Sequence, residues 1–327
     1  MTPAARLAAC AVAIATGFTG GAAAGRLLGP SHHHDDPEMP AAHHHEASTT
    51  PSADAGDPHA GHHGAALQDG SGGSAAATMA ASAAPTAGAG GLLVTDAGYT
   101  LAADATILTG AGGEPFTFRI LGPDGRPVTA FATRHERDLH LVVVSRDLAG
   151  YHHLHPDRAG DGTWTVALPP LAPGAHHAFA SFAPVGGPDL TLGTGLLVPG
   201  EAGATPLPDT GTTVALDGGY TVELDATGVT PGAASTVTVT VRRDGAPVTD
   251  LEPHLGALGH LVALRAGDLA YAHVHPVEAG GSGPSVPFVL HLDAPGDHRL
   301  FFEFAHAGTT HTAAFTLHVP TPTEAAP

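Results

Sequence analysis

Two H-x-H-P elements have the residue types and spacing best suited to chemistry in this sequence. They are His153-Leu154-His155-Pro156 and His273-Val274-His275-Pro276. Side chains two residues apart on a β-strand point to the same face, with Cα atoms about 6.5–7 Å apart. Two imidazoles at that spacing can tilt toward one ion. For zinc, each nitrogen then lies about 2.0–2.1 Å from the metal. The proline that follows ends the hydrogen-bond ladder, so each pair is expected at the end of a sheet, open to ions.

Further histidines surround each element. In each unit one histidine begins the preceding strand and one lies in the loop upstream. In the second unit two more flank a hairpin turn near the C-terminus. The candidate metal ligands are His260, His273, His275, His254, His306, His311, His140, His153, His155 and His135. A lone histidine at a strand end is more often solvated or hydrogen-bonded, and recurrence can reflect plain duplication. The sequence favours a better-formed site in the second half, because Pro184 stands where His306 is expected by the repeat.

These histidines lie within an internal repeat with a spacing of roughly 120 residues. Six patches recur in one order, among them the Asp124-Gly125 and Asp244-Gly245 turns. The repeat predicts two domains, residues 92–200 and 211–320, joined by a Pro/Gly-rich segment. Because each unit is about 100 residues of short Val/Thr/Leu runs, the fold class is all-β: two tandem immunoglobulin-like β-sandwich domains.

The first unit is expected to contain seven strands. The predicted ranges are 99–107, 115–121, 139–145, 150–155, 163–168, 175–183 and 190–197. Glycine in the Asp-Gly turns accepts positive φ, which favours hairpins there. With 44 Gly and 29 Pro, the chain is poorly suited to helices.

Two segments precede the repeats. Residues 1–29 are predicted to be a signal peptide or an N-terminal anchor, because Arg6 stands before an apolar run that ends in small residues. Leu7-Ala8-Ala9-Cys10 also resembles a lipobox. Residues 30–91 form an Ala/Gly/Pro/Ser/His tract that is expected to be disordered, and its nine histidines are suited to weak, multivalent metal capture. The domains are therefore expected outside the cytoplasm, with membrane contact through an uncleaved N-terminal segment alone.

The composition indicates which classes of ligand the protein can bind. The formal net charge of −19 with 25 His gives a surface that attracts cations and repels nucleic acid. One Cys and three Met cannot build thiolate zinc sites or Met-rich Cu(I) sites. Imidazole with oxygen favours Cu(II), Zn(II) or Ni(II). The sequence has no G-x-S-x-G, H-E-x-x-H or phosphate-cradling glycine motif, so an enzyme is not expected.

The H-L-V-x-L strand, the Y-x-H-x-H-P element and the later P-G-x-H/Y…F-x-x-F strand resemble the YtkA-like domain family. That family is similar to the CopC group of extracytoplasmic copper-handling β-sandwiches. The resemblance covers residues 92–200 and 211–320 and implies an immunoglobulin-like fold, a cell-envelope location and a link to copper handling. A copper exporter or oxidase-assembly factor is the partner it implies. The Met ligands of some copper carriers have no counterpart here, so copper(II) or zinc(II) is the expected ion.

The sequence thus predicts an extracytoplasmic, non-enzymatic protein that binds or buffers a divalent transition metal through His clusters. Because neutral imidazole is the ligand, metal affinity is expected to fall below about pH 6.5. The alternative is a structural or protein-interaction module of the cell envelope, in which the histidines have no ligand role.

Overall fold

The computed structural model describes residues 90–277 and 281–321, without the side chains of His273 and His275. The predictions for residues 1–29 and for the linker up to residue 89 lie outside the described residues. Within the described part, the all-β prediction is confirmed, because its elements are strands. No helix in this part has the length and apolar character needed to cross a membrane.

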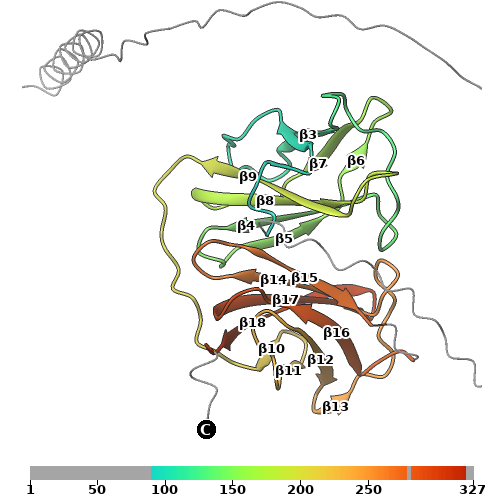
Figure 1. Ribbon diagram of the computed structural model, residues 1–327. Helices are drawn as coiled ribbons and strands as arrows, with labels where there is room; N and C mark the ends of the chain where they lie inside the picture. Colours follow the sequence, from blue (N-terminus) through green and yellow to red (C-terminus); the bar gives the residue numbers. More distant parts are fainter. Residues whose placement is uncertain (1–89, 278–280, 322–327) are drawn as a thin grey trace, which may run out of the picture. The chain divides into compact units, whose positions relative to one another are not determined.

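The first sandwich consists of two antiparallel sheets, ordered β1-β2-β3-β7-β6 and β5-β4-β8-β9 (Figure 1). Its strands are β1 (Thr95–Asp96), β2 (Tyr99–Ala103), β3 (Pro115–Leu121), β4 (Leu139–Ser145), β5 (Tyr151–Leu154), β6 (Asp157–Arg158), β7 (Thr163–Ala167), β8 (Gly174–Phe182) and β9 (Leu190–Val198). All seven predicted strands are present. The strand predicted for 99–107 ends at Ala103, because the chain then crosses to the other sheet, where Ile107 bridges Leu197.

The second sandwich repeats this plan with its two sheets joined. Its order is β10-β11-β12-β16-β15-β14-β17-β18, with β13 paired to β12. The strands are β10 (Thr213–Leu216), β11 (Tyr220–Asp225), β12 (Ala234–Arg243), β13 (Ala246–Pro247), β14 (His260–Arg265), β15 (Tyr271–Pro276), β16 (Ser285–His291), β17 (Gly296–His306) and β18 (Thr309–Val319).

The H-x-H elements lie where the chain passes from one sheet to the other. In the second sandwich, β15 pairs with β14 at Tyr271 and Ala272 and then with β16 from His273 onward. In the first sandwich the same stretch is divided into β5 and β6. The prediction that proline ends the ladder is right for Pro156, but Pro276 stays in β15, opposite Phe288.

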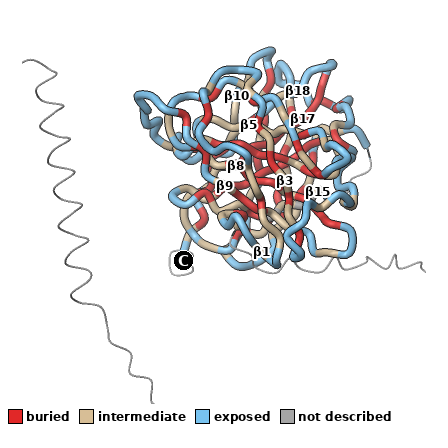
Figure 2. Tube along the Cα trace, turned by 90° about the horizontal axis from the view of Figure 1, so that it is seen from above, coloured by how far each residue is buried: buried red, intermediate tan, exposed pale blue. Residues whose placement is uncertain are grey.

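Each sandwich has its own apolar core, built by the alternation of inward and outward side chains along the strands. In β12, for example, Val237, Val239 and Val241 are fully buried while the intervening residues are not. Figure 2 shows buried positions concentrated in the strands and exposed positions in the loops. This period of two is what the sequence pattern predicted.

A third apolar cluster joins the two sandwiches. From β4, β8 and the following turns come Val142, Val144, Leu148 and Phe179, and from the second sandwich come Val262, Leu264, Leu269 and Phe301. Tyr151 stacks on Phe301 with ring centroids 4.0 Å apart, and Phe179 lies 5.4 Å from Tyr271. The sheets that carry β4 and β14 are therefore covered on both faces, which explains their continuous apolar runs.

Candidate metal centre

The pairing of β4 with β5 brings the histidines of the first sandwich together. Val142 lies opposite His153 in this ladder, so both side chains leave the sheet on one face. His140 is two residues before Val142 in β4, which places it on that face too, and His155 follows directly after the end of β5. Val142 belongs to the cluster between the sandwiches, and the imidazoles consequently face the second repeat.

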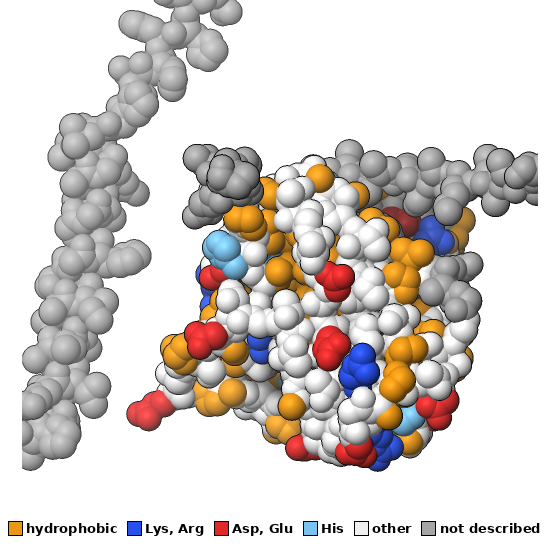
Figure 3. Space-filling view, turned by 90° about the horizontal axis from the view of Figure 1, so that it is seen from below, with side chains coloured by type: hydrophobic (Ala, Val, Ile, Leu, Met, Phe, Trp, Pro, Cys, Tyr) orange, Lys and Arg blue, Asp and Glu red, His pale blue; other side chains and the backbone are white. Residues whose placement is uncertain are grey.

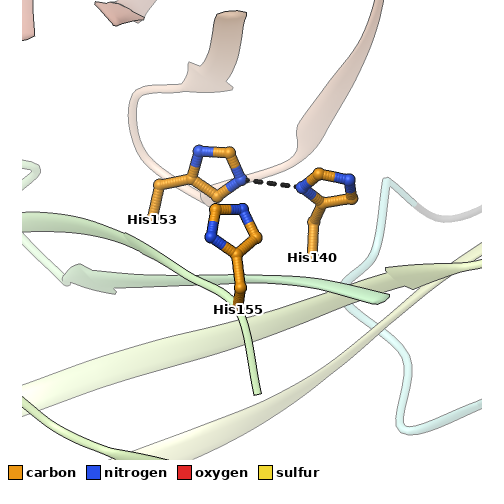
Figure 4. Close-up of side chains that lie close together, drawn as sticks. All are labelled: His140, His153 and His155. Carbon is orange, nitrogen blue, oxygen red and sulfur yellow. Dashed lines mark hydrogen bonds between the residues drawn. The ribbon is translucent and has the colours of Figure 1, made fainter. Parts of the chain in front are cut away.

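The ring nitrogens of His140, His153 and His155 converge, and we call these residues the three-histidine site (Figure 4). One nitrogen of each ring lies within 4.8 Å of those of the other two. Nδ1 of His140 and Nε2 of His153 are 3.0 Å apart. Two nitrogens bound to one ion at about 2.0–2.1 Å are roughly 2.9–3.4 Å apart in square-planar or tetrahedral geometry. This pair already has the separation of two ligands of one ion.

The opposite nitrogens of these two rings are held by acceptors. Nε2 of His140 donates to the carbonyl of Arg134 at 3.0 Å, and Nδ1 of His153 donates to Oε2 of Glu303 at 2.6 Å. When both rings are neutral, these bonds leave two lone pairs facing each other, which repel unless a cation lies between or beside them. Metal-ligating histidines have the same second-sphere pattern, an N–H given to a carbonyl or carboxylate.

The third ring supplies a nitrogen that lacks a protein partner. Nε2 of His155 is buried and makes no hydrogen bond to any described residue. Its ring centroid is 4.8 Å from that of His153 and 5.1 Å from that of His140. A buried polar atom without a partner is costly, so a ligand at this point would satisfy it.

Burial lowers the pKa of two of these three rings, His140 and His155. Desolvation lowers the pKa of His140 to about 4, the bond to the Arg134 carbonyl opposes this shift, and the charge of Arg137 adds to it. Desolvation likewise lowers the pKa of His155 to about 3. Because the ligand form of histidine is the neutral imidazole, protons compete weakly for these nitrogens near neutral pH.

The second sandwich adds a ring next to this site. His260 is buried, and desolvation lowers its pKa to about 3. Its Nε2 donates to the carbonyl of His254, six residues upstream, at 2.9 Å. His140 makes the equivalent bond to the carbonyl of Arg134, also six residues upstream. Its centroid lies 5.9 Å from that of His153 and 6.3 Å from that of His140.

The two predicted loop histidines are neighbours of this ring. His135 lies with its centroid 5.5 Å from His260 and 6.0 Å from His140, and His254 lies 5.8 Å from His260. They are not equivalent positions of the repeat. The tight turn that begins at His254 in the second sandwich begins at Arg134 in the first, as the matching bridges of both turns indicate.

His306 and His311 do not join this cluster. In β17, Phe302 and Phe304 point into the core of the second sandwich, and His306 shares their face, whereas Glu303 points toward the first sandwich. His306 accepts from the Tyr220 hydroxyl at 2.6 Å and donates to Asp250 at 3.2 Å. His311 packs on the rings of Phe304 and Tyr220. The side chains of His273 and His275 lie outside the description.

Glu303 is a site residue that the sequence reasoning missed. It is only 8% exposed and lies opposite His260 in the β14–β17 ladder. A signal was available, because a carboxylate stands inside the apolar run from Leu300 to Ala305 and charged residues are rarely buried without a partner. The partner, His153, is 150 residues away in the chain and on the other repeat.

A cavity of about 520 Å³ opens onto these residues. His140, His153 and His260 line it together with Arg134 and Arg137. Acidic side chains, Asp96, Asp138, Asp189 and Asp293, also line its wall. The cavity therefore reaches two of the three histidines of the site, His140 and His153, and carboxylates line part of its wall.

Comparison with solved structures finds matches at low similarity. The Lin-41 filamin domain is 12% identical, with 30% of this chain and 91% of that chain covered and a TM-score of 0.23. Domains 4 and 5 of the S-layer protein SbsC are 13% identical, with 70% and 100% covered and a TM-score of 0.22. The Yersinia pseudotuberculosis adhesin InvE is 13% identical, with 71% and 62% covered and a TM-score of 0.21. Likenesses at this level carry no information about what the chain binds.

Comparison with curated proteins gives no match. The resemblance of the histidine motifs to the YtkA-like family stays a prediction. A family match does cover both sandwiches, at residues 94–192 and 212–321. These two segments together make up more than half of the 327 residues. The chain therefore belongs to the family described as domain of unknown function DUF8832.

Proposed function

We propose that this protein binds a divalent transition metal, copper(II) or zinc(II), at the three-histidine site, without catalysing a reaction. The observation that supports this is the arrangement around His140 and His153. Their outer nitrogens are held by Arg134 and Glu303, and their inner nitrogens are 3.0 Å apart. With both rings neutral, two inner lone pairs are directed at each other beside the unpartnered His155 nitrogen, and a bound cation would satisfy all three.

The donor set supports borderline metals over soft ones. Every methionine (Met1, Met39 and Met79) and the lone Cys10 precede the sandwiches in the sequence, so the site is built from imidazole without sulfur. Imidazole suits Cu(II) and Zn(II), and Cu(II) heads the affinity order for such ligands. The excess of 31 acidic over 12 basic residues favours cation attraction in general.

The role in this proposal is capture and buffering in the cell envelope. The sequence of residues 1–29 supports export, and the nine linker histidines would collect ions weakly before the folded site holds them. A copper exporter or an oxidase-assembly factor is the proposed partner. This part of the proposal rests on the sequence and on its resemblance to the YtkA-like family.

Calorimetric titration of the full chain with Cu(II) and Zn(II) tests the site. The nine linker histidines are replaced by serine in every sample, so that they add no heat. We expect one binding event that His155→Ala removes. The matched control is His318→Ala, because His318 on the edge strand β18 is exposed and pairs with Asp297 of β17. Equal binding by the parent and His155→Ala chains would contradict the proposal.

A structural or interaction module remains the second candidate, favoured by exposed apolar side chains. Ile107 and Val185 are each 66% exposed, and Leu197, which bridges Ile107, is 46% exposed. On the face shown in Figure 3, apolar groups reach the surface among scattered charges. Exposed apolar groups that adjoin one another can mark contact surfaces. This candidate expects the titration above to show no difference between parent and His155→Ala.

A further inference from the structure

The three-histidine site leaves one coordination position open. Zn(II) in structural sites is held by four protein ligands, while sites with three protein ligands keep water in the fourth position. What lies opposite the first sandwich therefore decides the character of the site. In this structure that neighbour is the second sandwich, docked through the cluster that contains Val142 and Phe301.

We infer that the ion is shared between the two repeats, with His260 of the second sandwich as its fourth ligand. This inference rests on the proposed function of the three-histidine site. It assigns the second repeat a direct part in coordination, so that metal binding and the docking of the sandwiches become one event.

The orientation of His260 supports this role. Its Nε2 is committed to the carbonyl of His254, which leaves Nδ1 as the nitrogen able to bind an ion. His140 has the same arrangement, with Nε2 on a carbonyl and Nδ1 directed into the site. Two repeats of one sequence thus present equivalent rings, with equivalent tautomers, to the same boundary.

The distances require little movement. Rings bound through nitrogen to one tetrahedral ion have centroids roughly 5 Å apart, given bonds of about 2.0–2.1 Å. Within the three-histidine site the centroids are 4.8 to 5.3 Å apart. His260 lies 5.9 Å from His153 and 6.3 Å from His140. An approach of about 1 Å, within the range of side-chain adjustment on binding, closes the set.

Glu303 supports the same conclusion from the second sandwich. It lies beside His260 on the β14–β17 ladder and holds His153 of the first sandwich by Nδ1. A carboxylate behind a ligating histidine fixes its tautomer and raises its basicity. The second repeat thus supplies Glu303, which positions His153, and His260, which is the fourth ligand of the same ion.

The wild-type ligand count is the first test. X-ray absorption of Zn(II) bound to the full chain with serine in place of the nine linker histidines counts the imidazoles around the ion. We expect four. Three imidazoles plus an oxygen would overturn the role of His260 while leaving the three-histidine site intact.

Substitution is the second test, by calorimetry on the same background. His260→Gln keeps a donor for the His254 carbonyl and lacks the ring Nδ1. We expect it to weaken Zn(II) binding at least about tenfold, which is what loss even of an outer partner of a metal ligand typically costs. His135→Ala, which removes the other nearby ring, and the control His318→Ala are expected to bind like the parent. If X-ray absorption still counts four imidazoles in His260→Gln but only three in His135→Ala, the fourth ligand is His135 instead.

The outcomes separate the two proposals. Loss of binding in His155→Ala with unchanged affinity in His260→Gln contradicts the shared site but leaves the proposed function standing. Unchanged binding in both contradicts the proposed function itself. Circular dichroism of each variant confirms that it is folded, and the ligand count of the parent chain does not depend on any variant.

Discussion

At the scale of single residues, the site consists of nitrogens whose tautomers are set by their neighbours. His140 and His260 are set by backbone carbonyls, and His153 is set by a carboxylate from another domain. Each outer bond directs the remaining lone pair inward. The residues that set the tautomers are therefore as informative about metal binding as the rings themselves.

Glu303 provides a prediction at this scale. Glu303→Leu removes the acceptor behind His153 Nδ1, and we expect about 10–100-fold weaker Zn(II) or Cu(II) binding, the usual cost of losing such a partner. Glu303→Gln keeps a neutral acceptor and is expected to recover part of that loss. Calorimetry of both variants is the measurement. Equal affinity in the parent and Glu303→Leu would show that the carboxylate does not orient the ligand.

At the scale of elements, the end of β5 decides where His155 lies, because the chain changes sheets there. β5 pairs with β4 from Tyr151 to Leu154, and His155 and Pro156 then lead the chain to the other sheet. The crossing leaves the second imidazole of the H-x-H pair free of the ladder, where its ring can turn toward His140. Hairpin turns hold the same scaffold in register.

The Asp244-Gly245 turn provides the element-scale prediction. Both residues have positive φ, 51° and 80°, which a two-residue hairpin with a type I′ turn requires. A Cβ added at Gly245 meets nothing within 4 Å, so the cost of Gly245→Ala is conformational, about 1–2 kcal/mol of unfolding free energy. Gly203→Ala is the matched control, because Gly203 also has open space around it and its φ is not positive. Urea unfolding measures both, and a loss as large in Gly203→Ala would contradict this explanation.

At the scale of the whole molecule, two repeats cover each other's histidines. Val142 and Val262, with the Tyr151–Phe301 stack, form an apolar contact beside the rings, whose other side opens to the cavity. Desolvation is consequently the largest cause of the lowered pKa values of His140, His155 and His260. The sequence alone predicted that metal affinity falls below about pH 6.5, and burial moves the expected loss for these ligands to lower pH.

Acidification should destabilise the metal-free chain. The pKa values of His140, His155 and His260 are lowered to about 4, 3 and 3, whereas in the unfolded chain histidine has a pKa of about 6.5. Below about pH 6.5 the unfolded state therefore binds more protons, and stability falls as pH decreases toward about 4. Each group contributes at most about 1.4 kcal/mol per pH unit. Urea unfolding with a chelator between about pH 7.5 and pH 5 measures this, and a level free energy of unfolding would contradict it.

The sequence by itself determined the two repeats, the strands and the adjacency of His140 to the H-x-H element. These follow from local rules: side chains alternate along a strand, and short turns pair consecutive strands. The same rules are silent about which faces of the two sandwiches meet, because that contact depends on packing between residues more than a hundred positions apart. Only the tertiary structure therefore decided that His260 faces the three-histidine site, that Glu303 holds His153, and that His306 points into a core instead.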